Sequence, residues 1–102
     1  MEREELLKLI ETKEVIGVDL SGQRLEKIDF TGCRIERTSF KGCELVHCRF
    51  RNAKISWSDF RYAEIQHGTF EGAEIEFSDF YRAFIDGVVI FSGSSFSNCS
   101  LN

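Results

Sequence analysis

The chain has 102 residues, about the length of one domain, with 42% hydrophobic residues, 29% charged residues and a formal net charge of -4. This composition is typical of a soluble globular protein and excludes a disordered tail. No apolar run approaches the roughly 20 residues that a membrane-spanning helix needs, so we expect no membrane partner. The mild acidity gives no sign of direct nucleic-acid binding.

The N-terminal segment, residues 2–12, is predicted to form an amphipathic helix. Leu6, Leu7 and Ile10 form an apolar stripe, and glutamates in the first turn suit the helix dipole. The segment lacks the basic start and apolar stretch of a signal peptide. We expect residues 1–15 to cap a second unit, residues 16–102, which is built from a repeat.

A five-residue repeat runs through this second unit. Every fifth residue from Leu20 to Ile90 is Leu, Ile or Phe, and the residue two positions earlier is small or apolar, except at Gln23. A period of five fits neither a helix nor a long strand, but it fits a very short strand followed by a corner. The second corner position often holds a residue that tolerates positive φ: Gly22, Gly32, Gly42, Asn52, Gly72 and Gly87.

Similarity at an offset of twenty residues sets the number of sides. Ser58–Ile65 resembles Ser78–Ile85, and Arg49–Ile55 resembles Thr69–Ile75. The large inward residues also alternate between Phe and Ile or Leu, which indicates an even number of sides. Four sides of five residues therefore make one square coil, and the chain is long enough for about four coils.

The segments Ser58–Ile65 and Phe70–Ile75 best carry a resemblance to the pentapeptide-repeat family, whose pattern is a small residue, Asp or Asn, Leu or Phe, then two variable residues. The resemblance covers about residues 18–101. It implies an all-β solenoid, a right-handed quadrilateral β-helix of about four coils of four pentapeptides, with the short N-terminal capping α-helix. Near the end the phase slips by one residue, so that Phe96 and Leu101 become the large residues, which predicts a bulge around Ser92–Ser95.

The four cysteines are expected to be reduced, unpaired and buried. Cys33, Cys43, Cys48 and Cys99 match no zinc-site spacing and form no C-x-x-C pair. All four fall on the small inward position once the slip before Cys99 is allowed. Reduced thiols favour an intracellular, cytoplasmic protein.

Two columns of exposed residues are predicted at the corners. His47 and His67 stack after Lys27, and a solvated pair is favoured there over a metal site because two ligands make a poor one. Arg37, Trp57 and Phe77 form the second column, the candidate protein-binding column. For this second column a surface ladder with a cation–π contact is favoured over a protein-binding role.

The C-terminal end is a candidate dimer interface. Phe84, Val89 and Phe91 are predicted to point outward, above Glu64, Thr69 and Glu71, and Phe96 lies beside them. Large apolar side chains next to an uncapped core favour an end-to-end homodimer, which is similar to how other members of the family dimerise. The alternative is a monomer in which residues 92–102 fold over the patch.

Nothing in the sequence indicates catalysis, a cofactor or a metal, since no general base is placed beside an activated nucleophile. The leading hypothesis is therefore a non-catalytic scaffold that binds another protein. The alternative is a DNA-mimic inhibitor or protector of a type II topoisomerase (gyrase), because some bacterial pentapeptide-repeat proteins act in this way. The charge distribution argues against mimicry: residues 24–61 carry nine basic and five acidic residues (+4), and residues 62–90 carry one and six (-5).

Overall fold

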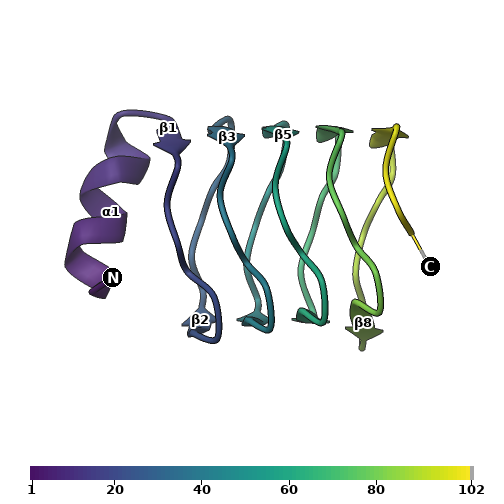
Figure 1. The fold of residues 1–102 in the computed structure, drawn as a ribbon, viewed down its shortest axis with the longest axis horizontal. Helices are drawn as coiled ribbons and strands as arrows, with labels where there is room; N and C mark the ends of the chain where they lie inside the picture. The colour runs from purple at the N-terminus through teal and green to yellow at the C-terminus, as the bar shows by residue number, and fades with distance from the viewer. Residues whose placement is uncertain (102) are drawn as a thin grey trace.

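The computed structural model describes residues 1–101 and shows a β-solenoid of about four turns behind one short N-terminal helix (Figure 1). The solenoid is a rod of about 31 × 21 × 21 Å. Its elements in chain order are α1 (Arg3–Glu11), β1 (Glu14–Ile16), β2 (Arg24–Glu26), β3 (Arg34–Glu36), β4 (Glu44–Val46), β5 (Lys54–Ser56), β6 (Glu64–Gln66), β7 (Glu74–Glu76), β8 (Phe84–Asp86) and β9 (Ser95–Ser97). Among the residues described, no helix is both long and apolar enough to cross a bilayer.

Four sides enclose the core. The odd-numbered strands form one parallel sheet, β1-β3-β5-β7-β9, and the even-numbered strands form the opposite sheet, β2-β4-β6-β8 (Figure 1). Single parallel bridges make the other two sides. One side, here called the Asp19 side, runs through Asp19, Ser39, Asp59, Asp79 and Ser100, and the other, the Asp29 side, runs through Asp29, Arg49, Thr69 and Ile90. Up to β8 the register is twenty residues per coil, which confirms the predicted square coil.

Each corner is closed by a residue with positive φ. Glycines such as Gly22 and Gly32 hold this conformation at φ 72° and 70°, as the repeat predicts. Eleven residues other than glycine also adopt it, among them Trp57 (φ 53°) and Phe77 (φ 51°). A side chain in this region costs about 1–2 kcal/mol, so the parallel ladders on both sides of each corner must hold it in place.

Two columns of stacked phenylalanines fill the core. Phe50 stacks on Phe30 at 4.7 Å and on Phe70 at 4.6 Å, while Phe60 stacks on Phe40 and Phe80 at 4.6 and 4.5 Å. The two columns meet edge to face. The small inward positions belong to the same core, and where they hold Thr or Ser the buried hydroxyl donates a hydrogen bond to a backbone carbonyl.

The helix α1 closes the N-terminal end of the stack. Leu6 and Ile10 are buried against the first coil, whereas Leu7 is 39% exposed and lies off the predicted stripe. The first inward residue is Val15 in β1, which is fully buried. The repeat therefore starts one unit before the first pentapeptide that the pattern revealed.

The phase slip lies earlier than predicted. Gln66 pairs with Asp86 at an offset of twenty, and Thr69 pairs with Ile90 at an offset of twenty-one, so the extra residue lies between 86 and 90 and not in Ser92–Ser95. Ser92 and Gly93 form an ordinary corner.

This shift corrects four orientations. Phe91 points inward and stacks on Phe70 at 5.3 Å, and Val89 is half-buried against the core, so their predicted outward placement is wrong. Val88 and Ile90, both predicted inward, are 70% and 45% exposed. The run Val88–Phe91 is apolar throughout, so a register of twenty and a register of twenty-one residues both satisfy the pattern. The second is observed because it places Phe91 on the phenylalanine stack. Phe84 does point outward opposite Glu64, as predicted.

Candidate functional site

An aromatic ridge lies along the corner between the odd-strand sheet and the Asp19 side. It consists of Arg37, Trp57 and Phe77, the candidate protein-binding column, which the register stacks twenty residues apart as predicted. The Trp57 and Phe77 rings are stacked at 4.6 Å with planes 6° apart, and the two residues are 60% and 41% exposed. Large aromatic side chains held rigidly in solvent are the residue types that dominate binding energy at protein interfaces.

Arg37 does not join the ring stack as a cation–π partner. Within residues 1–101 the one cation–π contact joins the Arg82 guanidinium to the ring of Tyr81, at 5.4 Å. The surface-ladder alternative therefore describes the Trp57–Phe77 pair but is wrong for Arg37. Both rings of the ridge are free of a cation from the described chain.

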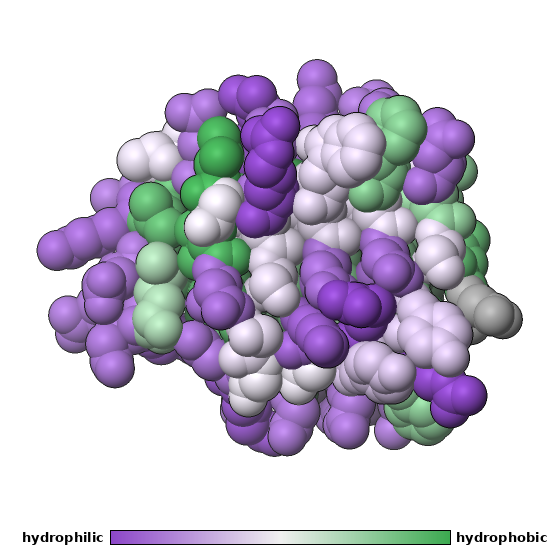
Figure 2. Space-filling model, in the orientation of Figure 1, coloured by the Kyte–Doolittle hydropathy of each residue, from purple (hydrophilic) through white to green (hydrophobic). Residues whose placement is uncertain are grey.

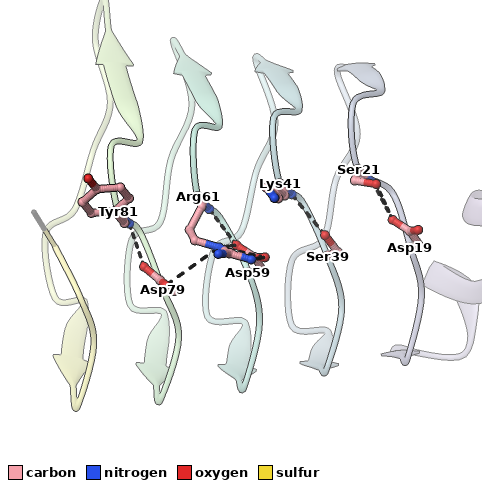
Figure 3. Close-up of polar contacts among 8 residues, drawn as sticks. All are labelled: Asp19, Ser21, Ser39, Lys41, Asp59, Arg61, Asp79 and Tyr81. Carbon is pink, nitrogen blue, oxygen red and sulfur yellow. Dashed lines mark hydrogen bonds and ion pairs between the residues drawn. The ribbon is translucent and has the colours of Figure 1, made fainter.

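The Asp19 side is organised by a repeated turn. Asp19, Asp59 and Asp79 each accept a hydrogen bond from the backbone N–H two residues later, at 3.0, 2.9 and 2.9 Å, and Ser39 does so more weakly at 3.3 Å (Figure 3). This is the Asx-turn geometry, and it explains why the repeat favours Asp before the large residue.

Local hydrogen bonds and a neighbouring charge lower the pKa of Asp19 and of Asp59. The Ser21 hydroxyl and backbone N–H hold the pKa of Asp19 below its usual value. Burial alone would raise the pKa of Asp59, but the hydrogen bonds and charge of Arg61 outweigh it and lower that pKa. Arg61 also reaches Asp79, at 3.9 Å. Asp19 and Asp59 therefore act as structural acceptors, and their lowered pKa values suit neither general-acid nor general-base chemistry at neutral pH.

The sequence reasoning missed a second aromatic group on the far edge of the Asp19 side. Tyr62 is 49% exposed and meets the Tyr81 ring edge to face at 5.9 Å, with Arg82 stacked on Tyr81. In Figure 2, pale ring-shaped side chains lie among the purple hydrophilic ones toward the C-terminal end. Tyr62 and Arg82 occupy the same corner position twenty residues apart, so the register could have revealed this group.

The histidine column is brought together as predicted. The His47 and His67 rings stack at 5.3 Å, 18° from parallel, and both residues are exposed. His67 Nδ1 accepts a hydrogen bond from the backbone N–H of Val88, at 3.3 Å, next to the phase slip. Within the described residues no three His, Cys, Asp or Glu side chains gather as metal ligands. Of the two histidines, His67 therefore contacts the slipped coil, through Val88.

The cysteines are unpaired, as predicted. Cys33, Cys43 and Cys48 are buried, whereas Cys99 is half-buried, so the prediction of burial holds for three of the four. Cys43 and Cys48 donate to the carbonyls of Leu20 and Leu25, at 2.9 and 3.2 Å. Burial raises the pKa of both thiols to about 11, which makes them poor nucleophiles.

The C-terminal end of the described stack is open. A hollow of about 240 Å³ lies there, between the inward side chains of the last coil. Its lining comprises Phe80, Ala83, Ile85, Phe91, Phe96 and Leu101. Exposed large apolar residues concentrate toward this end, since residues 17–56 hold none of them and the last half of the chain holds eight, including Phe84 at 62%.

Comparison with known proteins identifies the repeat. The profile of the pentapeptide repeat region matches residues 14–88, and no curated protein matches the chain. The solved structures similar to this chain include three proteins from different sources. A pentapeptide repeat protein from the Arabidopsis thaliana thylakoid lumen is 21% identical, with coverage of 88% of this chain and 63% of that one and a TM-score of 0.49.

The other two structures are more distant in sequence. QnrB1, a plasmid-mediated fluoroquinolone resistance protein, is 15% identical, with 83% and 54% coverage and a TM-score of 0.56. A pentapeptide repeat protein, Rfr23, from the cyanobacterium Cyanothece 51142 is 12% identical, with 95% and 92% coverage and a TM-score of 0.35. The chain spans less than two thirds of the Arabidopsis protein and of QnrB1. At these identities the likeness to QnrB1 concerns the fold alone.

Proposed function

Because the chain belongs to the pentapeptide repeat family, we propose that it is a non-catalytic scaffold that binds another protein through the aromatic ridge. The observation that carries this proposal is the exposed, rigidly stacked Trp57–Phe77 pair. A filled rod offers no enclosed cleft for a substrate, whereas a flat side with a projecting aromatic edge suits a protein surface.

A comparison of captured partners tests this proposal. Wild-type protein, a Trp57→Ala, Phe77→Ala variant and a His47→Ala variant are each used as bait in lysate of the source organism. His47→Ala is the control, because His47 is also an exposed stacked ring on a different corner, whereas the bond to the slipped coil comes from His67. The proposal expects a partner that is lost with the aromatic variant alone. Identical partner lists for all three baits would remove the ridge from consideration.

A second candidate is protection or inhibition of a type II topoisomerase by DNA mimicry. Its support is the fold shared with QnrB1 and the column of charged Asp19, Asp59 and Asp79. Against it, Asp59 and Asp79 both lie against Arg61, and the excess of basic residues over 24–61 breaks the acidic surface that a duplex mimic needs. A gyrase supercoiling assay decides: no effect at micromolar protein excludes this candidate.

We also propose a homodimer through the open C-terminal end. Phe91 and Phe96 line its hollow, Val89 packs behind them, and Phe84 projects beside it. Light scattering is expected to give about twice the chain mass of 11.8 kDa. Phe84→Glu with Leu101→Glu should restore the monomer, since both residues are more than half exposed. Wild-type monomer across the micromolar range would refute the dimer.

We also propose a cytoplasmic location, which the unpaired cysteines support because thiols stay reduced in that compartment.

A further inference from the structure

Resting on the proposed function, we propose that the ridge recognises a basic segment of its partner, with an arginine or lysine side chain seated beside Phe77 and Glu76. This deepens the scaffold proposal by naming the chemistry of the partner. Three observations support it: the charges along the ridge, the carboxylate that no cation of the chain neutralises, and the two exposed rings.

The two rows of residues that border the ridge carry no positive charge. One row is the last residue of each odd-numbered strand, and the other is the bridge residue of the Asp19 side. The first row is Ile16, Glu36, Ser56, Glu76 and Ser97, and the second is Asp19, Ser39, Asp59, Asp79 and Ser100. Every charged member is a carboxylate, so the charged partners that these two rows offer to a bound side chain are all negative.

The uncompensated part of this charge lies next to Phe77. Arg34 pairs with Glu36 at 2.7 Å and Arg61 pairs with Asp59 at 2.7 Å. Asp79 also pairs with Arg61, at 3.9 Å, whereas Glu76 is exposed and has no side-chain partner among the described residues. The carboxylate that remains open to an external cation is therefore Glu76, beside Phe77.

The rings add a second attraction at the same place. Trp57 and Phe77 are exposed, and within the described chain neither has a cation over its face. A guanidinium can lie against an aromatic ring and at the same time donate two hydrogen bonds to a carboxylate. Arg37 puts a positive charge at the other end of the ridge. A basic segment is thus directed to the Phe77 end and away from Arg37.

The chain provides its own probe, because Trp57 is its single tryptophan. Hexa-arginine peptide is titrated into the protein at low salt, and the Trp57 fluorescence is recorded, with hexa-glutamate as the comparison peptide. We expect a saturable change with hexa-arginine alone, weakened when salt rises from 50 to 200 mM.

A matched pair of charge variants locates the site. Glu76→Gln should weaken hexa-arginine binding at least fivefold, whereas Glu64→Gln should change it less than twofold. Glu64 is also an exposed strand carboxylate, and its loss changes the net charge equally, but it lies on the even-strand sheet. No saturable change with hexa-arginine, or an equal loss in both variants, would overturn the inference.

The same measurements separate this inference from the scaffold proposal. If the Trp57→Ala, Phe77→Ala bait loses a partner while hexa-arginine leaves Trp57 unchanged, the ridge binds protein but not through a basic segment. If hexa-arginine binds as expected but the captured partners are unaffected by the aromatic variant, the basic-segment chemistry holds and the scaffold proposal fails.

Discussion

Truncation of one phenylalanine inside the stack and one at its end provides a test of how this fold is held together. Phe50 is 1% exposed and stacks on Phe30 and Phe70, with edge contacts to Phe40 at 5.8 Å and Phe60 at 6.1 Å. Phe91 belongs to the same column, but it is half-buried and stacks on Phe70 at the longer distance of 5.3 Å, beside the open hollow.

The two positions differ in what can fill the space that truncation leaves. At Phe50 the coils on both sides are held by backbone ladders, so the cavity cannot collapse. We therefore expect Phe50→Ala to cost about 4–5 kcal/mol, the upper part of the range of roughly 3–5 kcal/mol for such truncations. At Phe91 solvent and neighbouring side chains can enter, and we expect Phe91→Ala to cost about 1–2 kcal/mol. A domain is stable by about 5–15 kcal/mol in total, so the inner change brings the protein close to unfolding.

Urea denaturation at one low protein concentration measures both values, with far-UV circular dichroism and Trp57 fluorescence as probes. Phe50→Leu is the control, because it keeps an apolar side chain of similar reach and should recover most of the loss. The slope of the unfolding free energy against urea should stay the same if the native coils are retained. Costs within about 1 kcal/mol of each other for Phe50→Ala and Phe91→Ala would refute this account of the stack.

Three further predictions concern thiols, a tight contact and the corners. At pH 8 a thiol reagent should label Cys99 well before Cys43 and Cys48, whose pKa is about 11 because of burial; early labelling of Cys43, read by peptide mass spectrometry, would contradict the assignment. Gly68→Ala should cost about 1–3 kcal/mol in a thermal melt, because the new Cβ would lie 2.7 Å from the Cys48 carbonyl oxygen. An unchanged melting temperature would contradict this, because it would mean that the backbone at Cys48 moves away from the new Cβ at no cost. Lys27→Gly should stabilise by about 0.5–1 kcal/mol, since relief of positive φ exceeds the entropy that glycine adds to the unfolded chain. Gly22→Lys should destabilise, because Gly22 also has a positive φ and open space for a side chain. If both variants change the free energy of unfolding in urea in the same direction, the strain argument is refuted.

Much of the candidate site follows from the register. Once twenty residues make one coil, Trp57 must lie over Phe77 and His47 over His67, because parallel strands place equivalent residues about 4.8 Å apart. The register does not determine the conformations of the long, flexible side chains. Arg34 turns to Glu36 and Arg61 to Asp59, and these choices leave Glu76 without a cation. Both ion pairs join residues two positions apart on one coil, and they depend on side-chain rotamers that the five-residue pattern does not specify.

The sequence by itself determined the period, the four sides and the inward residues from Leu20 to Phe80, because these are local consequences of a short strand and a corner repeated without interruption. Only the tertiary structure decided the last coil. Val88–Phe91 offers four apolar residues in a row, so burial alone selects no register there. The register is selected by the stacking of Phe91 on Phe70 and by the hydrogen bond from the Val88 N–H to His67. Phe70 and His67 both lie in the coil below, about twenty residues earlier in the chain. A contact between coils therefore decides what a five-residue pattern leaves open.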